Sequence, residues 1–538
     1  MTATESNLKY RVLNVLEESK KILSEHEQLR LFSLIDDSII RLSQPMQLAI
    51  IGKISSSKST LVNAILGASE IVRTGQMEET FNVSWLKYGD PQSQIKVVFK
   101  DGHTSNVPSS EWMKWTSHQE ENVLKEQVKY IEVPYNNDIL KEINIIDTPG
   151  LDALSQIDSK NTISFLKEVN PDAVIMLFTK SIAETTMSVL QDFQNVGNDS
   201  FNLSALNAIG VLAKADTMWN PFNNAQDMIE QGNRVVNTTL YDKYPEVRKS
   251  LFSILPVSSL MGLASSTLND EDIAKIHHLV KIDSDTLLEM LSSPDFFLDE
   301  EYNVDLSINE RKSLYKKLGL YGIFILTETI KRNKDASLDF LRETLRAKSG
   351  FDKLFLTILS HFGGRATLIK SQSILKDILN EISRAKLSAT GIAHNAIAEV
   401  ENAIVMTLLS MHEYKEWEYL SKYYEGKLEI DTAIASEFIA LCGERGYSAT
   451  DRLNQESYIS ASDLENIAVN RALYWQKQYN IISDIEPETG NFYKVIISSY
   501  NKLIKEIREA SLEYDRAKAM LDHASSFLGI NYNKILES

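Results

Sequence analysis

Residues 46–66 of the chain read MQLAIIGKISSSKSTLVNAIL. An apolar run typical of a buried strand gives way, through a polar loop, to residues with the apolar spacing of a helix. The loop follows the pattern Gly-x4-Gly-Lys-Ser/Thr, which aims backbone amides and an ammonium group at phosphate oxygens. It departs from that pattern at one position, because Ser57 stands where the second glycine belongs. Taken alone, the loop fits a serine-rich turn equally well.

Three further segments close apolar runs and follow the loop in the order that a guanine-nucleotide site requires. Asp147-Thr-Pro-Gly150 offers a carboxylate for the water shell of Mg²⁺ and a glycine amide for the γ-phosphate. Lys214-Ala-Asp216 offers a carboxylate that accepts hydrogen bonds from guanine N1–H and the 2-amino group, which discriminates against adenine. Ser258 ends another apolar run, where a loop that covers the guanine is expected. Four elements in this order, each at the end of a strand, indicate one nucleotide site rather than a coincidence.

The four elements together define the expected site for GTP or GDP with Mg²⁺. The expected nucleotide contacts are Gly52, Ser56, Ser57, Lys58, Ser59, Thr60, Asp147, Gly150, Lys214, Asp216 and Ser258. The ammonium group of Lys58 is the expected cation at the β- and γ-phosphates. Ser59 and Asp147 are the residues of these elements expected near the metal.

The segment between Met46 and Val257 alternates short apolar runs with stretches of helix length. Near-continuous apolar strands separated by helices predict a mostly parallel sheet covered on both faces, the architecture of an α/β P-loop GTPase domain. The predicted strands are residues 46–51, 143–147, 173–178, 208–212 and 251–257.

The regions outside these strands are predicted to be largely helical. Residues 1–45 repeat an apolar residue every seven positions and read as helix up to Pro45. Heptads at 368–392 and 500–528 predict an elongated all-α helical stalk, either an internal bundle or a coiled coil. Three domains are expected: an N-terminal helix at 1–45 that joins the neck or stalk, a GTPase domain at 46–365, and a helical neck and stalk at 366–538. The GTPase domain is expected to contain an acidic insertion at about 266–345 and a helix stop or hinge at Gly363-Gly364.

The composition limits the classes of function. The 56 basic and 74 acidic residues give a net charge of −18, which argues against a nucleic-acid partner. The one cysteine, Cys442, excludes an internal disulfide and a thiolate metal cage. No run approaches the roughly 18 apolar residues of a membrane span, and the first residues lack the order of a secretion signal. We therefore expect a cytoplasmic protein that contacts membranes only peripherally.

The motifs resemble those of the dynamin superfamily, and specifically those of the bacterial dynamin-like proteins. The loop has the family's serine at Ser55, and Glu79-Thr80 up to Lys87-Tyr88-Gly89 is similar to the family's switch I segment. The resemblance implies that Thr80 closes over Mg²⁺ as a metal ligand with Ser59 and Asp147, and that Lys58, Ser55 and Thr80 are the catalytic residues. Segments 348–354 and 362–365 look like the end of such a GTPase domain. The helical remainder is most similar to the enterotoxin-output (LeoA) type.

This resemblance implies a mechanochemical enzyme. It predicts GTP hydrolysis, nucleotide-dependent pairing of GTPase domains or larger self-assembly, and movement of the stalk in membrane remodelling or vesicle release. Apolar segments 403–411 and 433–441 are the candidates for a tip that contacts lipid, and both also fit the core of a helical bundle.

The chain departs from the family's pattern at several positions. Ser57 adds a side chain where glycine is favoured, Ile54 and Leu151 replace polar residues expected near the attacking water, and Val83 replaces a proline. These departures favour an alternative, a pseudo-GTPase helical scaffold with weak or no hydrolysis. Intact Lys58, Thr80, Asp147 and Asp216 favour the enzyme. A P-loop ATPase is a third interpretation, which Lys214-Ala-Asp216 opposes.

Overall fold

The computed structural model of the chain forms two compact units, one of residues 40–373 and one that combines residues 1–39 with 374–538. The structure describes residues 3–24, 29–52, 56–68, 82–112, 115, 127–148, 169, 171–179, 206–222, 227–241, 247–302, 304–444, 446, 448–455 and 459–528. Within this part of the chain, no helix has the length and apolar content needed to cross a membrane.

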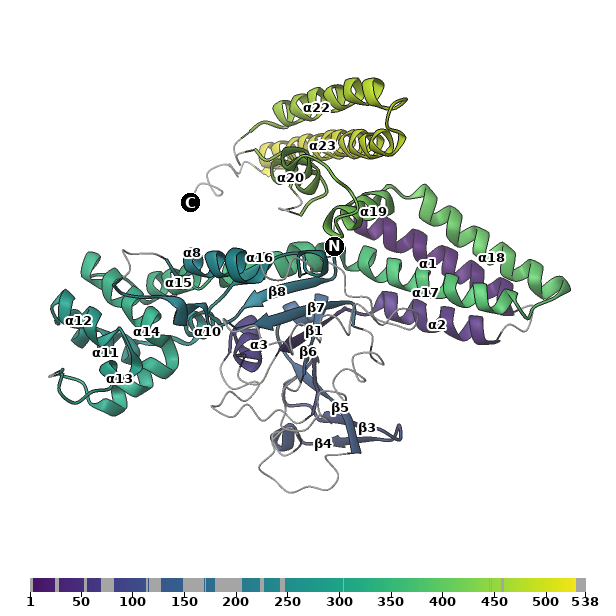
Figure 1. Ribbon diagram of the computed structural model, residues 1–538. Coiled ribbons are helices and arrows are strands. Elements are labelled where there is room, and N and C mark those ends of the chain that lie inside the picture. The colour runs from purple at the N-terminus through teal and green to yellow at the C-terminus, as the bar shows by residue number, and fades with distance from the viewer. Residues whose placement is uncertain are drawn as a thin grey trace. The chain divides into compact units, whose positions relative to one another are not determined.

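The unit of residues 40–373 is built on a nine-stranded sheet (Figure 1). The strands follow the order β4-β3-β5-β2-β6-β1-β7-β8-β9 across the sheet. Their bounds are β1 Met46–Gly52, β2 Ser84–Tyr88, β3 Ile95–Phe99, β4 Thr104–Val107, β5 Val128–Tyr135, β6 Ile143–Asp147, β7 Ala173–Phe178, β8 Ala208–Leu212 and β9 Ile254–Pro256. All five predicted strands are present, although β9 is shorter than its apolar run.

The five predicted strands pair in parallel along the chain of neighbours β6-β1-β7-β8-β9. Every residue of β1, β6, β7 and β8 is buried, which explains why these strands are almost entirely apolar, apart from Gln47, Asn144 and Asp147. The remaining strands were not predicted, and they make the sheet mixed. Strand β2 pairs antiparallel with β6, and β3 pairs antiparallel with both β4 and β5. The predicted mostly parallel α/β domain is therefore confirmed, with an added antiparallel edge.

Helices surround the sheet of this unit, and Figure 1 shows α8 above β8 and α3 beside β1 and β6. The helices are α3 Lys58–Leu66, α5 Ile139–Glu142, α8 Met228–Val235, α9 Val247–Ser250, α10 Ser259–Thr267, α11 Asp270–Val280, α12 Ser284–Met290, α13 Pro294–Phe297, α14 Ile308–Arg332, α15 Leu338–Lys348 and α16 Phe351–Thr357. Helices α11 to α14 occupy the predicted insertion. They share a hydrophobic core with α8, α10 and α15, which includes Leu279, Met290, Phe297 and Leu326, so the acidic stretch folds as packed helices against the rest of the unit.

The second unit is entirely helical in its described residues. It contains α1 Ala3–Ser24, α18 Gly391–Ser410, α19 His412–Tyr424, α20 Thr432–Leu441, α21 Ala449–Arg452, α22 Ala461–Ile482 and α23 Pro487–Leu528, with most of α2 Leu29–Ser43 and α17 Ala366–Lys386. Ion pairs join α1 to α2 through Lys20–Asp36 and α17 to α18 through Lys386–Glu401. Of the apolar residues that recur every seven positions, Leu8 and Val15 are buried, Ile22 is partly buried and Leu29 is exposed. The helical stalk predicted from periodicity is thus present as packed helices.

Three predictions for the helical regions were wrong in detail. Residues 1–45 form two helices, α1 and α2, rather than one. The glycine pair at 363–364 does not stop the helix, since the chain changes its winding through π and 3₁₀ turns at 358–365 before α17 continues; the alternative of a hinge at this place stays a prediction. The first C-terminal heptad does not stay in one helix, because α17 ends at Lys386. Glycine pairs and heptads describe local preference, and tertiary packing decides where a helix ends.

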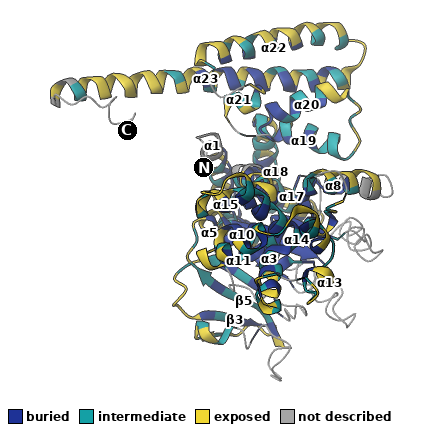
Figure 2. Cartoon of the chain, turned by 90° about the vertical axis from the view of Figure 1, so that its left-hand side faces the viewer, coloured by how far each residue is buried: buried dark blue, intermediate teal, exposed yellow. Residues whose placement is uncertain are grey.

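The long helix α23 is covered over only part of its length (Figure 2). Tyr500, Leu503 and Ile507 are buried in the part of α23 that packs against α19, α20 and α22, whereas Tyr514 and Leu521 in the same heptad are exposed. The apolar residues of segment 433–441 also lie in the core, including Phe438 and Leu441. In segment 403–411, Met406 and Leu409 are exposed, so only this candidate for a lipid-contacting tip presents apolar side chains to solvent.

A buried charge cluster fixes the entry to the sheet. The carboxylate of Asp172, just before β7, is fully buried and accepts hydrogen bonds from Arg41 Nη2 at 2.8 Å and from the backbone amide of Gln47 at 2.9 Å. Lys370 lies 4.0 Å from the same carboxylate and donates to the carbonyls of Arg41, at 2.9 Å, and of Gln44 and Pro45 at the end of α2. A cation at this position complements the carbonyl end of a helix. The cluster therefore ties α2 and α17 to the first residues of β1 and β7.

Asp172→Ala is expected to destabilise this unit strongly. The substitution leaves Arg41 and Lys370 without their common counter-charge, and the loss of one partner from a buried ion pair costs about 3–5 kcal/mol. Asp138→Ala is the matched control, because the Asp138 side chain is 89% exposed and forms an ion pair with Lys141, whose own side chain is 50% exposed. Thermal denaturation should show a large fall in melting temperature for Asp172→Ala and almost none for Asp138→Ala. Equal melting temperatures for the two variants would contradict this account.

Candidate functional site

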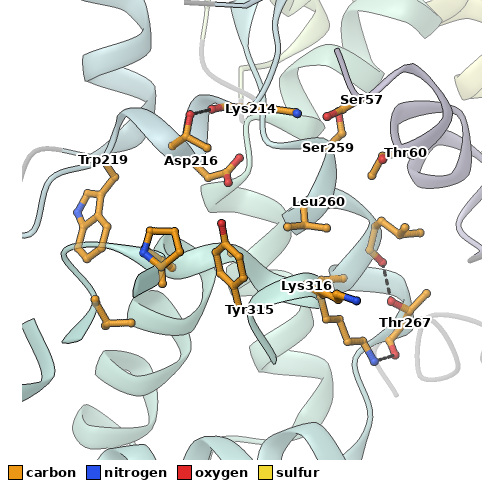
Figure 3. A pocket seen from close by; sticks show the side chains of 18 of the residues that line it. Ser57, Thr60, Lys214, Asp216, Trp219, Ser259, Leu260, Thr267, Tyr315 and Lys316 are labelled. Carbon is orange, nitrogen blue, oxygen red and sulfur yellow. Dashed lines mark hydrogen bonds between the residues drawn. The ribbon is translucent and has the colours of Figure 1, made fainter. Parts of the chain in front are cut away.

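The ends of β1, β6, β8 and β9 meet at one edge of the sheet, beside a cavity of about 1070 Å³. The cavity is lined by Ser57 and Thr60 from the loop and helix after β1, by Lys214 and Asp216 after β8, and by Ser259 after β9 (Figure 3). The structure thus brings three of the four predicted elements to one cavity. The fourth element, at the end of β6, lies at the same edge, because Asp147 pairs with Ile50 of β1.

The phosphate-binding elements begin where β1 ends at Gly52. A Cβ at this glycine would lie 2.6 Å from Ser56 Oγ and 2.9 Å from Leu177 Cβ, so the loop returns close over the strand and leaves no room for a side chain. Helix α3 then starts at Lys58, whose Nζ donates a hydrogen bond to the carbonyl of Gly52 at 3.1 Å. This contact holds the ammonium group against the start of the loop, as the phosphate-binding interpretation requires.

Ser57 is the residue that precedes α3, and its backbone has φ 69° and ψ 28°. This left-handed conformation costs a residue with a side chain roughly 1 kcal/mol relative to glycine. The structure therefore shows the physical cost of the departure from the glycine pattern. Ser56, by contrast, is fully buried, its Oγ has no hydrogen-bond partner, and it is not among the described residues with positive φ.

The metal-binding elements are described in part. Asp147 ends β6 and is fully buried, and Ser59 in the first turn of α3 is 2% exposed. The next residue, Thr148, donates a hydrogen bond from Oγ1 to the carbonyl of Ile50 at 2.8 Å, which fixes the backbone after the strand. Hydroxyl and carboxylate oxygens suit Mg²⁺, which completes its shell with water and phosphate. Ser55, Thr80 and Gly150 lie outside the described residues, so their predicted roles stay predictions.

Among the described residues no group of three or more His, Cys, Asp or Glu side chains has the arrangement of a metal site. The residues present fit Mg²⁺ in another way, since Ser59 and Asp147 supply one hydroxyl and one carboxylate beside a loop suited to phosphate.

The predicted base-recognition element forms a tight turn after β8. Lys214 has φ 55°, and Asp216 lies in the 3₁₀ turn Ala215–Met218 that follows it. Burial raises the pKa of the Asp216 carboxyl, while a hydrogen bond from Ser258 and the charge of Lys214 act in the opposite direction. Ser258 Oγ also accepts a hydrogen bond from the amide of Met261 at 3.2 Å as the N-cap of α10. Ser258 therefore positions the aspartate carboxylate and starts the covering helix at the same time.

The sequence did not predict the outer wall of the cavity. It comes from the helical insertion and from the residue after the 3₁₀ turn, and its members include Trp219, Leu291, Pro294, Tyr315, Lys316, Gly319 and Leu320 (Figure 3). The sequence signal that could have indicated this wall was Gly319 in the middle of a helical segment. Glycine destabilises a helix, so its presence there indicates a packing or functional requirement. The insertion thus belongs to the candidate site.

Ser57→Gly is expected to stabilise the unit of residues 40–373. Relief of the left-handed strain gives up to about 1 kcal/mol, reduced by the greater freedom of glycine in the unfolded chain. Ser56→Gly makes the same chemical change one residue earlier at a position without positive φ, and it should destabilise. Chemical denaturation of the two variants measures the difference. If both variants lose the same stability, Ser57 is not strained in the folded protein.

Comparison with known proteins identifies one family. The sequence model of the dynamin family matches residues 48–215. This range contains the phosphate-binding loop and the Asp147 segment, and it ends one residue before Asp216. Three of the four elements that predicted a nucleotide site therefore lie in or directly beside the matched region, and Ser258 lies outside it.

Two bacterial proteins extend the similarity. The isoniazid-induced protein IniC of Mycobacterium tuberculosis is 23% identical over 455 residues, which cover 83% of this chain and 87% of its own length. Dynamin-like protein 2 of Campylobacter jejuni is 30% identical over 145 residues, which cover 27% of this chain and 23% of its own length. A solved oligomerised bacterial dynamin pair, described as a mechanism for long-range sensing and tethering of membranes, aligns with 97% of this chain and 79% of its own at 16% identity and a TM-score of 0.32.

Proposed function

We propose, because the chain belongs to the bacterial dynamin-like large GTPases, that it binds GTP with Mg²⁺, hydrolyses it and couples the reaction to movement of a helical stalk. The observation that supports this proposal is the meeting of Lys58, Asp147 and Asp216 at one edge of a parallel sheet. A phosphate cation, a metal carboxylate and a base-reading carboxylate there form the arrangement of a guanine-nucleotide site. The finer likeness to the enterotoxin-output type stays a prediction.

In this proposal each residue has a distinct task. Lys58 neutralises charge on the β- and γ-phosphates, and Asp216 accepts hydrogen bonds from the guanine edge. Ser59, Asp147 and Thr80 hold Mg²⁺, which neutralises charge that develops on the phosphate oxygens. Ser55 and the backbone of Gly150 act at the γ-phosphate. The substrate site takes no nucleic acid, which is consistent with the net charge of −18.

We further propose that residues 46–365 act as the GTPase domain and that residues 1–45 and 366–538 act as neck and stalk. Pairing of two GTPase domains, or larger self-assembly, would then drive movement of the stalk. This movement would be used in membrane remodelling or vesicle release. Attachment would be peripheral, from the cytoplasm. These steps rest on family membership and await direct tests.

A second candidate function is a pseudo-GTPase scaffold. It is favoured by the side chain of Ser57, which lines the cavity at a position where the family's loop has glycine. Such a protein would bind GTP weakly or not at all, and its helical unit would mediate its interactions with other proteins. Nucleotide binding separates the two functions.

Asp216→Asn is expected to change the base preference from guanine to xanthine. The amide exchanges an acceptor for a donor, which matches the carbonyl at position 2 of xanthine. Calorimetry on the full chain should show GDP bound more tightly than ADP by the wild type, and XDP bound more tightly than GDP by the variant. Lys58→Ala should weaken the binding of every nucleotide, because the backbone amides of the loop do not replace the charge of the ammonium group.

The control for this series is Lys316→Ala, which removes an exposed lysine from the outer part of the same cavity. It should leave the order of base preference unchanged. Equal affinity of the wild type for ADP and GDP would contradict the proposal that the site prefers guanine. Absence of any nucleotide binding in a folded wild type would favour the scaffold.

Met406→Glu combined with Leu409→Glu is expected to release the protein from liposomes. These α18 residues are 64% and 61% exposed, and charged side chains there oppose insertion of an apolar surface into lipid. The matched control is Leu473→Glu with Ile481→Glu in α22, where the side chains are similarly exposed. Flotation with vesicles should be salt- or detergent-reversible for wild type and control. Flotation that the α18 substitutions leave intact would remove segment 403–411 as the lipid contact.

A further inference from the structure

Helix α14 is interrupted at one buried residue. Gly319 has φ 67° and ψ 171°, whereas the residues on both sides continue as helix from Ile308 to Arg332. This combination of angles is essentially restricted to glycine. Leu318 before the break and Ile323 after it are both fully buried, so both halves of the helix pack into the core. A change of direction between two packed halves does not by itself require a conformation that no other residue tolerates.

The break lies against the base-recognition aspartate. A Cβ at Gly319 would come 3.0 Å from Asp216 Oδ2 and 3.7 Å from Leu260 Cδ2. Tyr315, one turn earlier on α14, lines the same cavity (Figure 3). Burial and then the negative charge of Asp216 raise the pKa of its phenol, which places the ring in the electrostatic reach of that carboxylate. Helix α14 thus passes the carboxylate so closely that a side chain at position 319 would be in tighter than ordinary van der Waals contact with it.

Contacts on each side of Gly319 hold the helix in this position. After the break, the ring centroids of Tyr321 and Phe324 lie 5.4 Å and 4.6 Å from that of Trp219, which follows the turn of Asp216. Before the break, Lys317 donates to the carbonyl of Thr267 at 2.8 Å and forms an ion pair with Asp272. Because both halves are anchored, a side chain at position 319 cannot be accommodated by a simple shift of α14, and the Asp216 carboxylate has to move instead.

We propose that Gly319 is a specificity-determining residue of the guanine pocket. Its missing side chain lets the helical insertion form the pocket wall while Asp216 keeps room to accept hydrogen bonds from both N1–H and the 2-amino group of guanine. The inference rests on the proposed function, since it describes how that same site distinguishes its base. The ligand that reports on it is an inosine nucleotide, which lacks only the 2-amino group.

Calorimetry with GDP and IDP on the full chain tests the proposal. A hydrogen bond to a charged group contributes about 1.5–3 kcal/mol, so the wild type should prefer GDP over IDP by roughly tenfold or more. Gly319→Ala should reduce that preference to about twofold or less, because a displaced carboxylate no longer meets the 2-amino group. Gly322→Ala is the matched control on the same helix. Its Cβ would meet Leu318 Cβ and Met261 Cγ at 3.3 Å, away from Asp216, so it should keep the preference even if it lowers stability.

A second variant covers the case in which Gly319→Ala does not fold. Asp216→Glu adds one methylene group toward the same space from the opposite side, without positive φ at position 216. It should also lose the preference for GDP over IDP. If a folded Gly319→Ala, or in its place Asp216→Glu, keeps the wild-type preference, the inference is wrong and the guanine site stands. If the folded wild type binds neither GDP nor IDP, the proposed function itself fails.

Discussion

Parallel pairing of β1 with β6 and β7 is the interaction on which the candidate site depends. Its register sets Ile50 opposite Asp147 and Gly52 opposite Leu177, so the loop after β1 and the carboxylate that ends β6 reach the same edge. Strands β8 and β9 continue the parallel run, which brings Lys214 and Ser258 to that edge as well. Residues far apart in the chain therefore meet because parallel strands must end on the same side of the sheet.

The same constraint explains which parts of the fold the sequence predicted. Strands β1, β6, β7 and β8 are buried on both faces, so each is a near-continuous apolar run that can be recognised locally. Strands β2 to β5 are half exposed or short, and their pairing in the antiparallel edge depends on partners elsewhere in the chain. The nucleotide-binding motifs could be recognised in the sequence because each motif directly follows a buried strand. The family comparison confirms the resemblance that these motifs carried.

What the sequence could not predict depends on tertiary contact. The heptad of α23 is continuous, yet Tyr500 is buried and Tyr514 is exposed, because the neighbouring helices cover only the first part of α23. Periodicity shows that a helix has an apolar face, and it does not show what packs on that face. The role of Gly319 is a stronger case. Glycine is required at this position because the carboxylate of Asp216 lies against it. Asp216 is far away in the sequence, and only the folded chain places the two residues together.

Backbone strain in the described residues is concentrated around the cavity. Ser57, Lys214 and Asn454 are the described non-glycine residues with positive φ, and the first two line the cavity. Gly319, with its glycine-only angles, lines it as well. Each such conformation costs of the order of 1 kcal/mol or more for a residue with a side chain, and strain of this kind persists where it is part of a site's function. A domain retained only as a scaffold would gain stability from glycine at position 57. The strained turns therefore favour a site that is still shaped for a ligand.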